Sequence, residues 1–186
     1  MQLVLSVLFL ACFSVEGQTP AVGAFSLALL FELFCALKRI RTKGLPSASR
    51  QQFVETLGER VAHFGFFLAF ISAPSVRGEP WPVLLLTCLF FRDPIVIYTR
   101  TFAASETRGN TISNPTEKLR RLIQGFTIVL LPAFRVVSGH YPSLQALRPR
   151  IFYLAMTPLA ALSLMAAMDC ILSNRKTYRK LARDGN

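Results

Sequence analysis

Apolar residues along the chain are concentrated in six blocks separated by short polar segments. The blocks cover residues 3–15, 20–37, 61–75, 81–99, 122–138 and 151–172. A helix that crosses a bilayer needs about 20 predominantly apolar residues. The second, fourth, fifth and sixth blocks meet this length, the third gains length from the half-polar residues 51–60, and the first is short. This pattern predicts an all-α fold, a polytopic membrane bundle of about six transmembrane helices that forms a single domain over residues 1–186.

The composition agrees with a membrane protein. Of the 186 residues, 52% are hydrophobic and only 17% are charged, which is rare in a soluble domain of this size. The first block has the length of a signal-peptide core, but it lacks the preceding Lys or Arg that a signal peptide normally has. A cleaved leader is therefore the alternative to a first membrane helix for residues 1–16.

Basic residues predict the orientation of the chain. Of its 21 Lys and Arg, six lie in residues 38–60, five in 100–121 and five after residue 172. Loops rich in Lys and Arg stay on the cytoplasmic side of a membrane. With six crossings these three segments share one face, which predicts a multi-pass protein of the cell inner (cytoplasmic) membrane with both termini in the cytoplasm. Topology and attraction to lipid headgroups thus explain the net charge of +11, and nucleic acid is not expected as a partner.

An Arg92–Asp93 pair interrupts the middle of the fourth block. A charged side chain at membrane depth costs about 2.5–3.5 kcal/mol on insertion scales, so such groups face the interior of a bundle and are paired there. We therefore expect Arg92 to point into the bundle. Because adjacent residues point about 100° apart on a helix, we also expect a partner from another helix.

Charges of both signs near the helix ends suggest a site for a phosphorylated substrate. Glu55 and Glu59 are spaced i,i+4 and so share one face of a helix. Mg²⁺ commonly joins such carboxylates to substrate phosphates, and Arg and Lys bind the phosphates themselves. The basic candidates are Arg92, Arg100, Lys118 and Arg120. The simpler alternatives are a solvated helix face for the glutamates and a membrane anchor for the basic residues.

Several segments resemble the CDP-alcohol phosphatidyltransferase family, and most of all its bacterial phosphatidylglycerophosphate synthases. FFRDPIVIYTR, residues 90–100, is similar to the family's fourth helix, where an Arg-acidic pair precedes a second Arg. KLRRLIQG, residues 118–125, is similar to the start of its fifth helix, with Lys118, Arg120 and Gln124 at the matching positions. The stretch from residue 159 to residue 176 is similar to its last helix and basic tail. The resemblance implies phospholipid biosynthesis, in which a phosphatidyl group moves from CDP-diacylglycerol to glycerol 3-phosphate with Mg²⁺ or Mn²⁺ as cofactor.

The chain departs from the family at its defining motif, D-x-x-D-G-x-x-A-R, eight residues, then G-x-x-x-D-x-x-x-D. In FVETLGERVAHF, residues 53–64, Glu55 and Glu59 stand at the last two aspartates, and no residue of the first half is retained. The resemblance implies that Glu55 and Glu59 bind metal, with Glu32 or Asp93 recruited, and that Glu59 is the base. The acceptor phosphate would then lie among Arg92, Arg100, Lys118 and Arg120.

The loss of those aspartates also favours a second hypothesis. The chain would be a catalytically inactive relative that binds anionic phospholipid or a partner membrane protein. The sequence leaves a homodimer open under both hypotheses.

Overall fold

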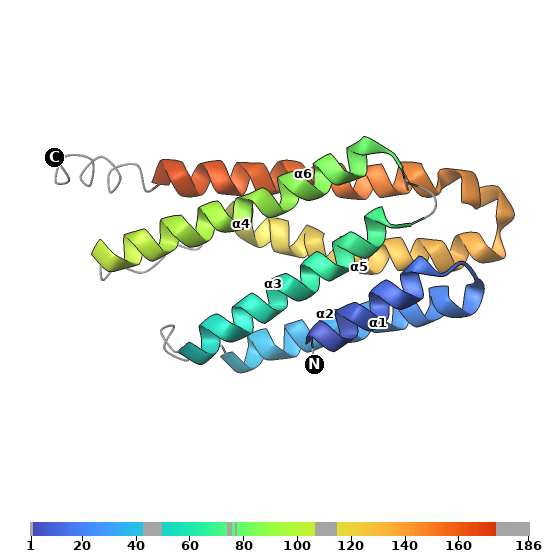
Figure 1. The fold of residues 1–186 in the computed structure, drawn as a ribbon, viewed down its shortest axis with the longest axis horizontal. Helices are drawn as coiled ribbons and strands as arrows, with labels where there is room; N and C mark the ends of the chain where they lie inside the picture. The colour runs from blue at the N-terminus through green and yellow to red at the C-terminus, as the bar shows by residue number, and fades with distance from the viewer. Residues whose placement is uncertain (1, 43–49, 74–75, 77, 107–114, 174–186) are drawn as a thin grey trace. The chain divides into compact units, whose positions relative to one another are not determined.

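The computed structural model describes the backbone of residues 2–42, 50–73, 76, 78–106 and 115–173. Side chains are described within these ranges except at 39, 41–42, 50–57, 96–106 and 173. The described chain is entirely helical, which confirms the predicted fold class (Figure 1). Its elements are α1 (Gln2–Ser14), α2 (Gln18–Thr42), α3 (Arg50–Ile71), α4 (Pro80–Glu106), α5 (Pro115–His140), the 3₁₀ helix η1 (Pro142–Leu147) and α6 (Arg148–Ser173).

Turn chemistry ends the helices close to the borders of the apolar blocks. Gly17 separates α1 from α2 with a φ of 136°, a backbone conformation that glycine adopts without steric cost. Tyr141 separates α5 from η1 in an extended conformation, as expected for a residue that precedes proline.

Three helical segments are long and apolar enough to cross a membrane, judged by length and composition. They are Gln18–Lys38, Pro115–His140 and Pro142–Leu172, and they coincide with the second, fifth and sixth apolar blocks. The structure therefore supports a multi-pass membrane protein. The described side chains of α3 begin at Gly58 and those of α4 end at Ile95, so the full apolar lengths of the third and fourth blocks lie partly outside them.

The helices group into two compact units. Unit 1 comprises residues 1–82 and 125–155, and unit 2 comprises residues 83–124 and 156–186. Unit 1 thus holds α1, α2, α3, most of α5, η1 and the start of α6. Unit 2 holds most of α4, the first turns of α5 and the rest of α6.

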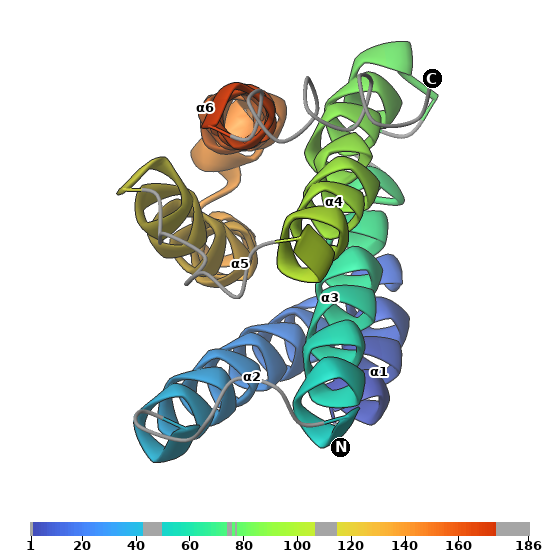
Figure 2. The same ribbon diagram turned by 90° about the vertical axis from the view of Figure 1, so that its left-hand side faces the viewer.

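Aromatic rings form the core of unit 1. In this unit α1 packs against both α2 and α3 (Figure 2). The Phe9 ring of α1 lies 4.3 Å from that of Phe66 on α3, and Phe66 lies 4.6 Å from Phe31 on α2. Phe13 and Phe70 extend the cluster, with their ring centroids 5.2 Å apart. Because Phe9 with Phe13 and Phe66 with Phe70 are each spaced i,i+4, each pair lies on one face of its helix.

Small side chains allow α1 and α3 to approach closely beside these rings. The Ser6 hydroxyl donates a buried hydrogen bond of 3.0 Å to the carbonyl oxygen of Ala62. A methyl group added at Gly65 would lie 1.9 Å from that hydroxyl oxygen. Small residues of this kind let membrane helices pack tightly, where van der Waals contact and interhelical hydrogen bonds provide the attraction.

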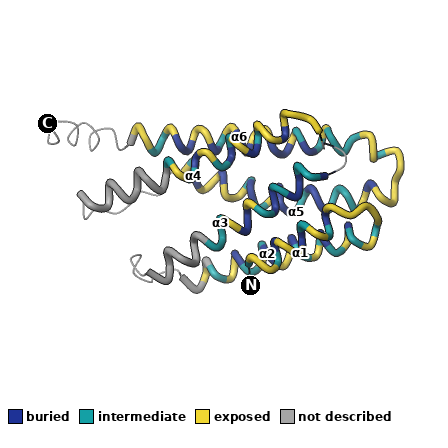
Figure 3. Tube along the Cα trace, in the orientation of Figure 1, coloured by how far each residue is buried: buried dark blue, intermediate teal, exposed yellow. Residues whose placement is uncertain are grey.

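Buried and exposed positions alternate along the described helices (Figure 3). Several charged residues are among the buried ones, and many large apolar residues are exposed. Arg92, Glu117 and Arg120 are buried, whereas Leu122, Leu154 and Met168 are each more than 60% exposed. In water such an extensive apolar exterior would mark an interaction surface. Since three helical segments are also long and apolar enough to span a bilayer, lipid is the environment that this surface fits.

Candidate anion-binding site

A group of charged side chains lies in unit 2, where α4 contacts the first turns of α5. We call it the arginine cluster. It consists of Arg92, Asp93, Glu117, Arg120, Arg121 and Gln124. Local sequence explains the start of α5, because proline is favoured in the first turn of a helix. Pro115 begins the helix and Glu117 is the acidic residue of that turn, where a negative charge complements the helix dipole.

Arg92 is the most buried charged group of the cluster, with a relative exposure of 2%. Its Nη1 donates a 2.7 Å hydrogen bond to Oδ1 of the neighbouring Asp93. Its Nη2 donates to Oε2 of Glu117, which belongs to α5. The prediction that Arg92 points inward and finds a partner on another helix is therefore confirmed. Asp93 also contacts Arg92, although the two residues are adjacent.

Glu117 joins the cluster together, because its two carboxylate oxygens accept from three arginines. Besides Arg92, Nε of Arg120 lies 3.2 Å from Oε2, and Nε of Arg121 lies 2.9 Å from Oε1. Arg120 also donates from Nη1 to Oε1 of Gln124 at 2.6 Å. These residues follow Glu117 at i+3, i+4 and i+7, so one face of α5 carries the whole network. Charge-assisted hydrogen bonds of this kind are about twice as strong as neutral ones.

The charges of the cluster do not cancel. Three guanidinium groups face the carboxylates of Asp93 and Glu117, which leaves one positive charge in excess. Lys118, the residue after Glu117, is exposed and adds a further positive charge at the same helix start, where the carboxylate of Asp169 offsets it. The side chain of Arg121 is 48% exposed, so it can reach an external anion while it remains bonded to Glu117.

A second polar contact in unit 2 joins the start of α5 to α6. The Thr116 hydroxyl donates a 2.7 Å hydrogen bond to Oδ2 of Asp169. This contact fixes the first turn of α5, and with it the directions in which Lys118 and Arg121 project.

The other predicted site residues are distributed over both units. Glu32 lies on α2 in unit 1, with its Oε1 3.9 Å from Nε2 of His63. The backbone oxygen of Glu59 lies 2.6 Å from Nδ1 of the same histidine. The side chains of Glu55 and Arg100 lie outside the described residues. The cluster thus brings together Arg92, Asp93 and Arg120 of the predicted set, with Lys118 beside them.

The predicted metal ligands do not form a metal centre among the described side chains. No group of three or more His, Cys, Asp or Glu residues in this part of the chain lies close enough to hold an ion. Asp93 and Glu117 are already bonded to arginine. Glu55 lies outside the described side chains, so Mg²⁺ or Mn²⁺ as cofactor stays a prediction from the sequence.

Sequence reasoning missed Glu117 and did not single out Arg121 as a ligand. Glu117 carries a recognisable local signal, since it lies in a first helical turn with arginines at i+3 and i+4. That signal is typical of an exposed surface pair. The Glu117 carboxylate becomes buried and bonded to Arg92 only because α4 packs against the start of α5.

Comparisons of the chain with protein-family models, with characterised proteins and with solved structures find no match. The resemblance to the phosphatidyltransferases accordingly stays a prediction from the sequence.

Proposed function

We propose that this protein is a multi-pass membrane protein that binds the phosphate group of an anionic membrane lipid at the arginine cluster. The observation that supports it most is the shared carboxylate of Glu117, which accepts from Arg92, Arg120 and Arg121. This carboxylate neutralises the inner part of the cluster. The excess positive charge is then directed to its outer side, where Lys118 and Arg121 are accessible.

Lys118 and Arg121 are the direct phosphate ligands in this proposal, and Arg120 supports them. The two ligands are spaced i,i+3, so about 5–6 Å separates their Cβ atoms and both can contact one phosphate. The start of α5 adds its own attraction, since backbone N–H groups at a helix N-terminus favour anions. Arg92 is too deeply buried to be the first contact, and its role is to hold Glu117 in position.

The depth of these residues fits a headgroup ligand. Both lie in the first two turns of the candidate span Pro115–His140, and the ends of membrane spans lie near the lipid phosphates. We propose six crossings with the basic segments 38–60, 100–121 and 173–186 in the cytoplasm, which places the cluster at the cytoplasmic leaflet. Labelling of cysteine reporters in intact cells tests this topology, and a reporter in any of the three segments that reacts from outside would contradict it.

Lipid titration of the full chain in neutral micelles tests the function. Short-chain phosphatidate should bind, and Lys118→Gln or Arg121→Gln should each weaken binding about tenfold, because a charge-assisted contact is worth roughly 1.5–3 kcal/mol. Arg150→Gln is the matched control, since Arg150 is exposed and belongs to unit 1 and not to the arginine cluster. Equal weakening of phosphatidate binding by all three substitutions would show that the cluster acts only as a general membrane anchor.

A second candidate function is phosphatidyl transfer from CDP-diacylglycerol to glycerol 3-phosphate. One observation favours it: Arg92 and Arg120, which the resemblance assigns to the acceptor's phosphate, contact the same carboxylate. Release of CMP by the purified protein with Mg²⁺ or Mn²⁺ is the direct assay. Release that is lost in Glu59→Gln would support the enzyme, and its absence would leave lipid binding as the function.

A further inference from the structure

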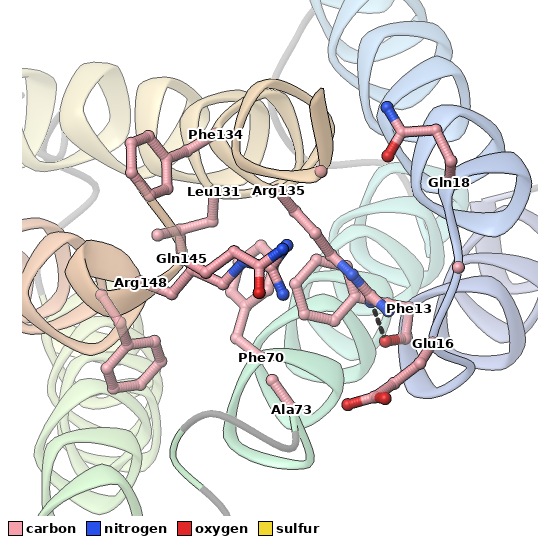
Figure 4. Close-up of a pocket in the computed structure, with 13 residues that line it drawn as sticks. Phe13, Glu16, Gln18, Phe70, Ala73, Leu131, Phe134, Arg135, Gln145 and Arg148 are labelled. Atoms are coloured by element: carbon pink, nitrogen blue, oxygen red, sulfur yellow. Dashed lines mark hydrogen bonds between the residues drawn. The ribbon is translucent and has the colours of Figure 1, made fainter. Parts of the chain in front are cut away.

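A cavity of about 370 Å³ lies within unit 1, apart from the residues of the arginine cluster (Figure 4). Its walls come from the end of α1, the start of α2, the end of α3, the second half of α5, and the η1–α6 segment. This volume falls within the range of small-molecule sites, about 300–1,000 Å³. Its polar wall contains Glu16, Gln18, Arg135, Gln145 and Arg148.

Arg135 is held firmly at one wall of this cavity. Its Nη1 and Nη2 donate to the carbonyl oxygens of Phe13 and Val15, where α1 ends. Its guanidinium carbon also lies 4.8 Å from the centre of the Phe13 ring. These contacts satisfy carbonyls that the end of a helix leaves without intrahelical donors. A guanidinium has five N–H donors, so Arg135 retains donors for a ligand.

Arg148 faces the same space from the start of α6. Its Nε donates a 2.7 Å hydrogen bond to Oγ of the fully buried Ser138. Within the described chain that is the hydrogen bond seen for this side chain, so its two Nη groups are open to the cavity. Figure 4 shows the polar ends of Arg135, Gln145 and Arg148 extending into one common space. Two guanidinium groups and the single carboxylate of Glu16 leave this wall with one positive charge in excess.

Four phenylalanines, Phe13, Phe70, Phe134 and Phe152, form most of the remaining wall, together with Leu131 and small residues. A site that combines two cations with four rings fits a ligand that has an anionic group joined to an apolar one. Two separate guanidinium groups also favour phosphate, because the two oxygens of a carboxylate are satisfied by a single bidentate arginine. The cavity lies where the candidate spans begin at Gln18 and Pro142 and end at His140, which is the depth of lipid headgroups.

We propose that this cavity is a second lipid site, which binds the phosphate headgroup of an anionic lipid between Arg135 and Arg148 with its apolar part against the phenylalanines. The connections at this end of unit 1 are poor in Lys and Arg. By the charge rule that assigns the basic segments to the cytoplasm, the site belongs to the opposite leaflet. The inference rests on the geometry of unit 1 and does not depend on the function proposed for the arginine cluster.

The test uses the full chain in neutral micelles, titrated with short-chain phosphatidate, short-chain phosphatidylcholine and inorganic phosphate. Arg148→Gln should weaken phosphatidate binding about tenfold or more, and Arg150→Gln, two residues along the same helix, should not. Phe134→Ala should weaken phosphatidate but leave inorganic phosphate unchanged. Arg148 is the residue to vary because Arg135 also supports the end of α1.

A chain with Lys118→Gln and Arg121→Gln separates this site from the arginine cluster. In that background the effect of Arg148→Gln on phosphatidate should persist in full. Loss of the effect there would overturn the second site. Equal affinity for inorganic phosphate and phosphatidate would show that the ligand of the cavity is not a lipid. Equal effects of Arg148→Gln and Arg150→Gln would show that the cavity is not a binding site.

Discussion

Aromatic contacts dominate the interior of unit 1, whereas the interior of unit 2 contains a network of charged groups beside apolar residues such as Met156 and Leu159. In unit 1, Phe9, Phe31 and Phe66 are fully buried against one another. In unit 2, Arg92 and Glu117 are almost as deeply buried, and hydrogen bonds between charged groups hold them. Contacts between helices therefore involve different side-chain chemistry in the two units.

The two kinds of interior contact differ in how much they contribute to the stability of the fold. Ring contacts stabilise wherever shapes fit, since they leave no polar group to satisfy. A buried ion pair must first overcome the cost of removing both charges from water, so it contributes little net stability while its loss is damaging. In the function proposed above, the contribution of the ionic network in unit 2 is to position the basic start of α5.

Substitution of Phe66 by Ala should produce the largest loss of stability. Phe66 is fully buried between Phe9 and Phe31, and truncation of such a ring costs about 3–5 kcal/mol. Unfolding of the protein in mixed detergent micelles measures the effect. Phe126→Ala, at a ring that is 62% exposed, should change the free energy of unfolding by less than about 0.5 kcal/mol.

Glu117→Gln should have the next largest effect, a loss of about 3 kcal/mol, because it leaves Arg92 and Arg120 without their shared carboxylate. Adding Arg92→Met to the same chain should recover part of this loss, since the uncompensated buried charge is then removed. Arg150→Gln, at an exposed arginine outside the cluster, serves as the control. A loss no larger than that of the control would show that the ionic interior is not coupled to folding.

Gly65→Ala should cost less, about 1–3 kcal/mol, by forcing α1 and α3 apart. The added Cβ would lie 1.9 Å from Oγ of Ser6, whereas a Cβ at Gly23 meets only Sγ of Cys12 at 3.6 Å. Gly23→Ala should accordingly be tolerated. The two variants are compared by thermal unfolding in the same detergent, and equal melting temperatures would mean that the α1–α3 contact is not tightly packed.

The positions of the apolar blocks were sufficient to predict the helices and could not predict their partners. The six apolar blocks correspond to six α-helices, because long apolar runs favour helices even where Pro94, Pro132 and Pro158 lie inside them. The phenylalanines of the first and third blocks could have faced either lipid or protein, because both environments are apolar. Nothing local to Phe9 or Phe66 indicates that their rings meet.

A charged residue could be placed from the sequence only where its exposure to lipid would be costly. Arg92 could be placed inside the bundle from sequence, since a guanidinium in mid-helix has few tolerable environments. Glu117 could not be placed inside the bundle from the sequence, because an acidic residue in the first turn of a helix is equally stable on a protein surface. Arg135 and Arg148 meet at a cavity built from six helices, and no pattern along the chain relates those elements.

In the six-crossing topology proposed above, α1 lies in the bilayer, and its short length then has a consequence for the lipid around it. Its 13 residues extend about 20 Å, less than the hydrocarbon thickness of about 30 Å. Its outer face exposes Leu3, Val4, Val7 and Leu8, so the apolar surface it offers to lipid covers only part of that depth. A bilayer thins locally to match a short apolar segment. Thinning beside α1 would lower the headgroups of one leaflet toward the end of this helix, where Arg135 and the cavity lie.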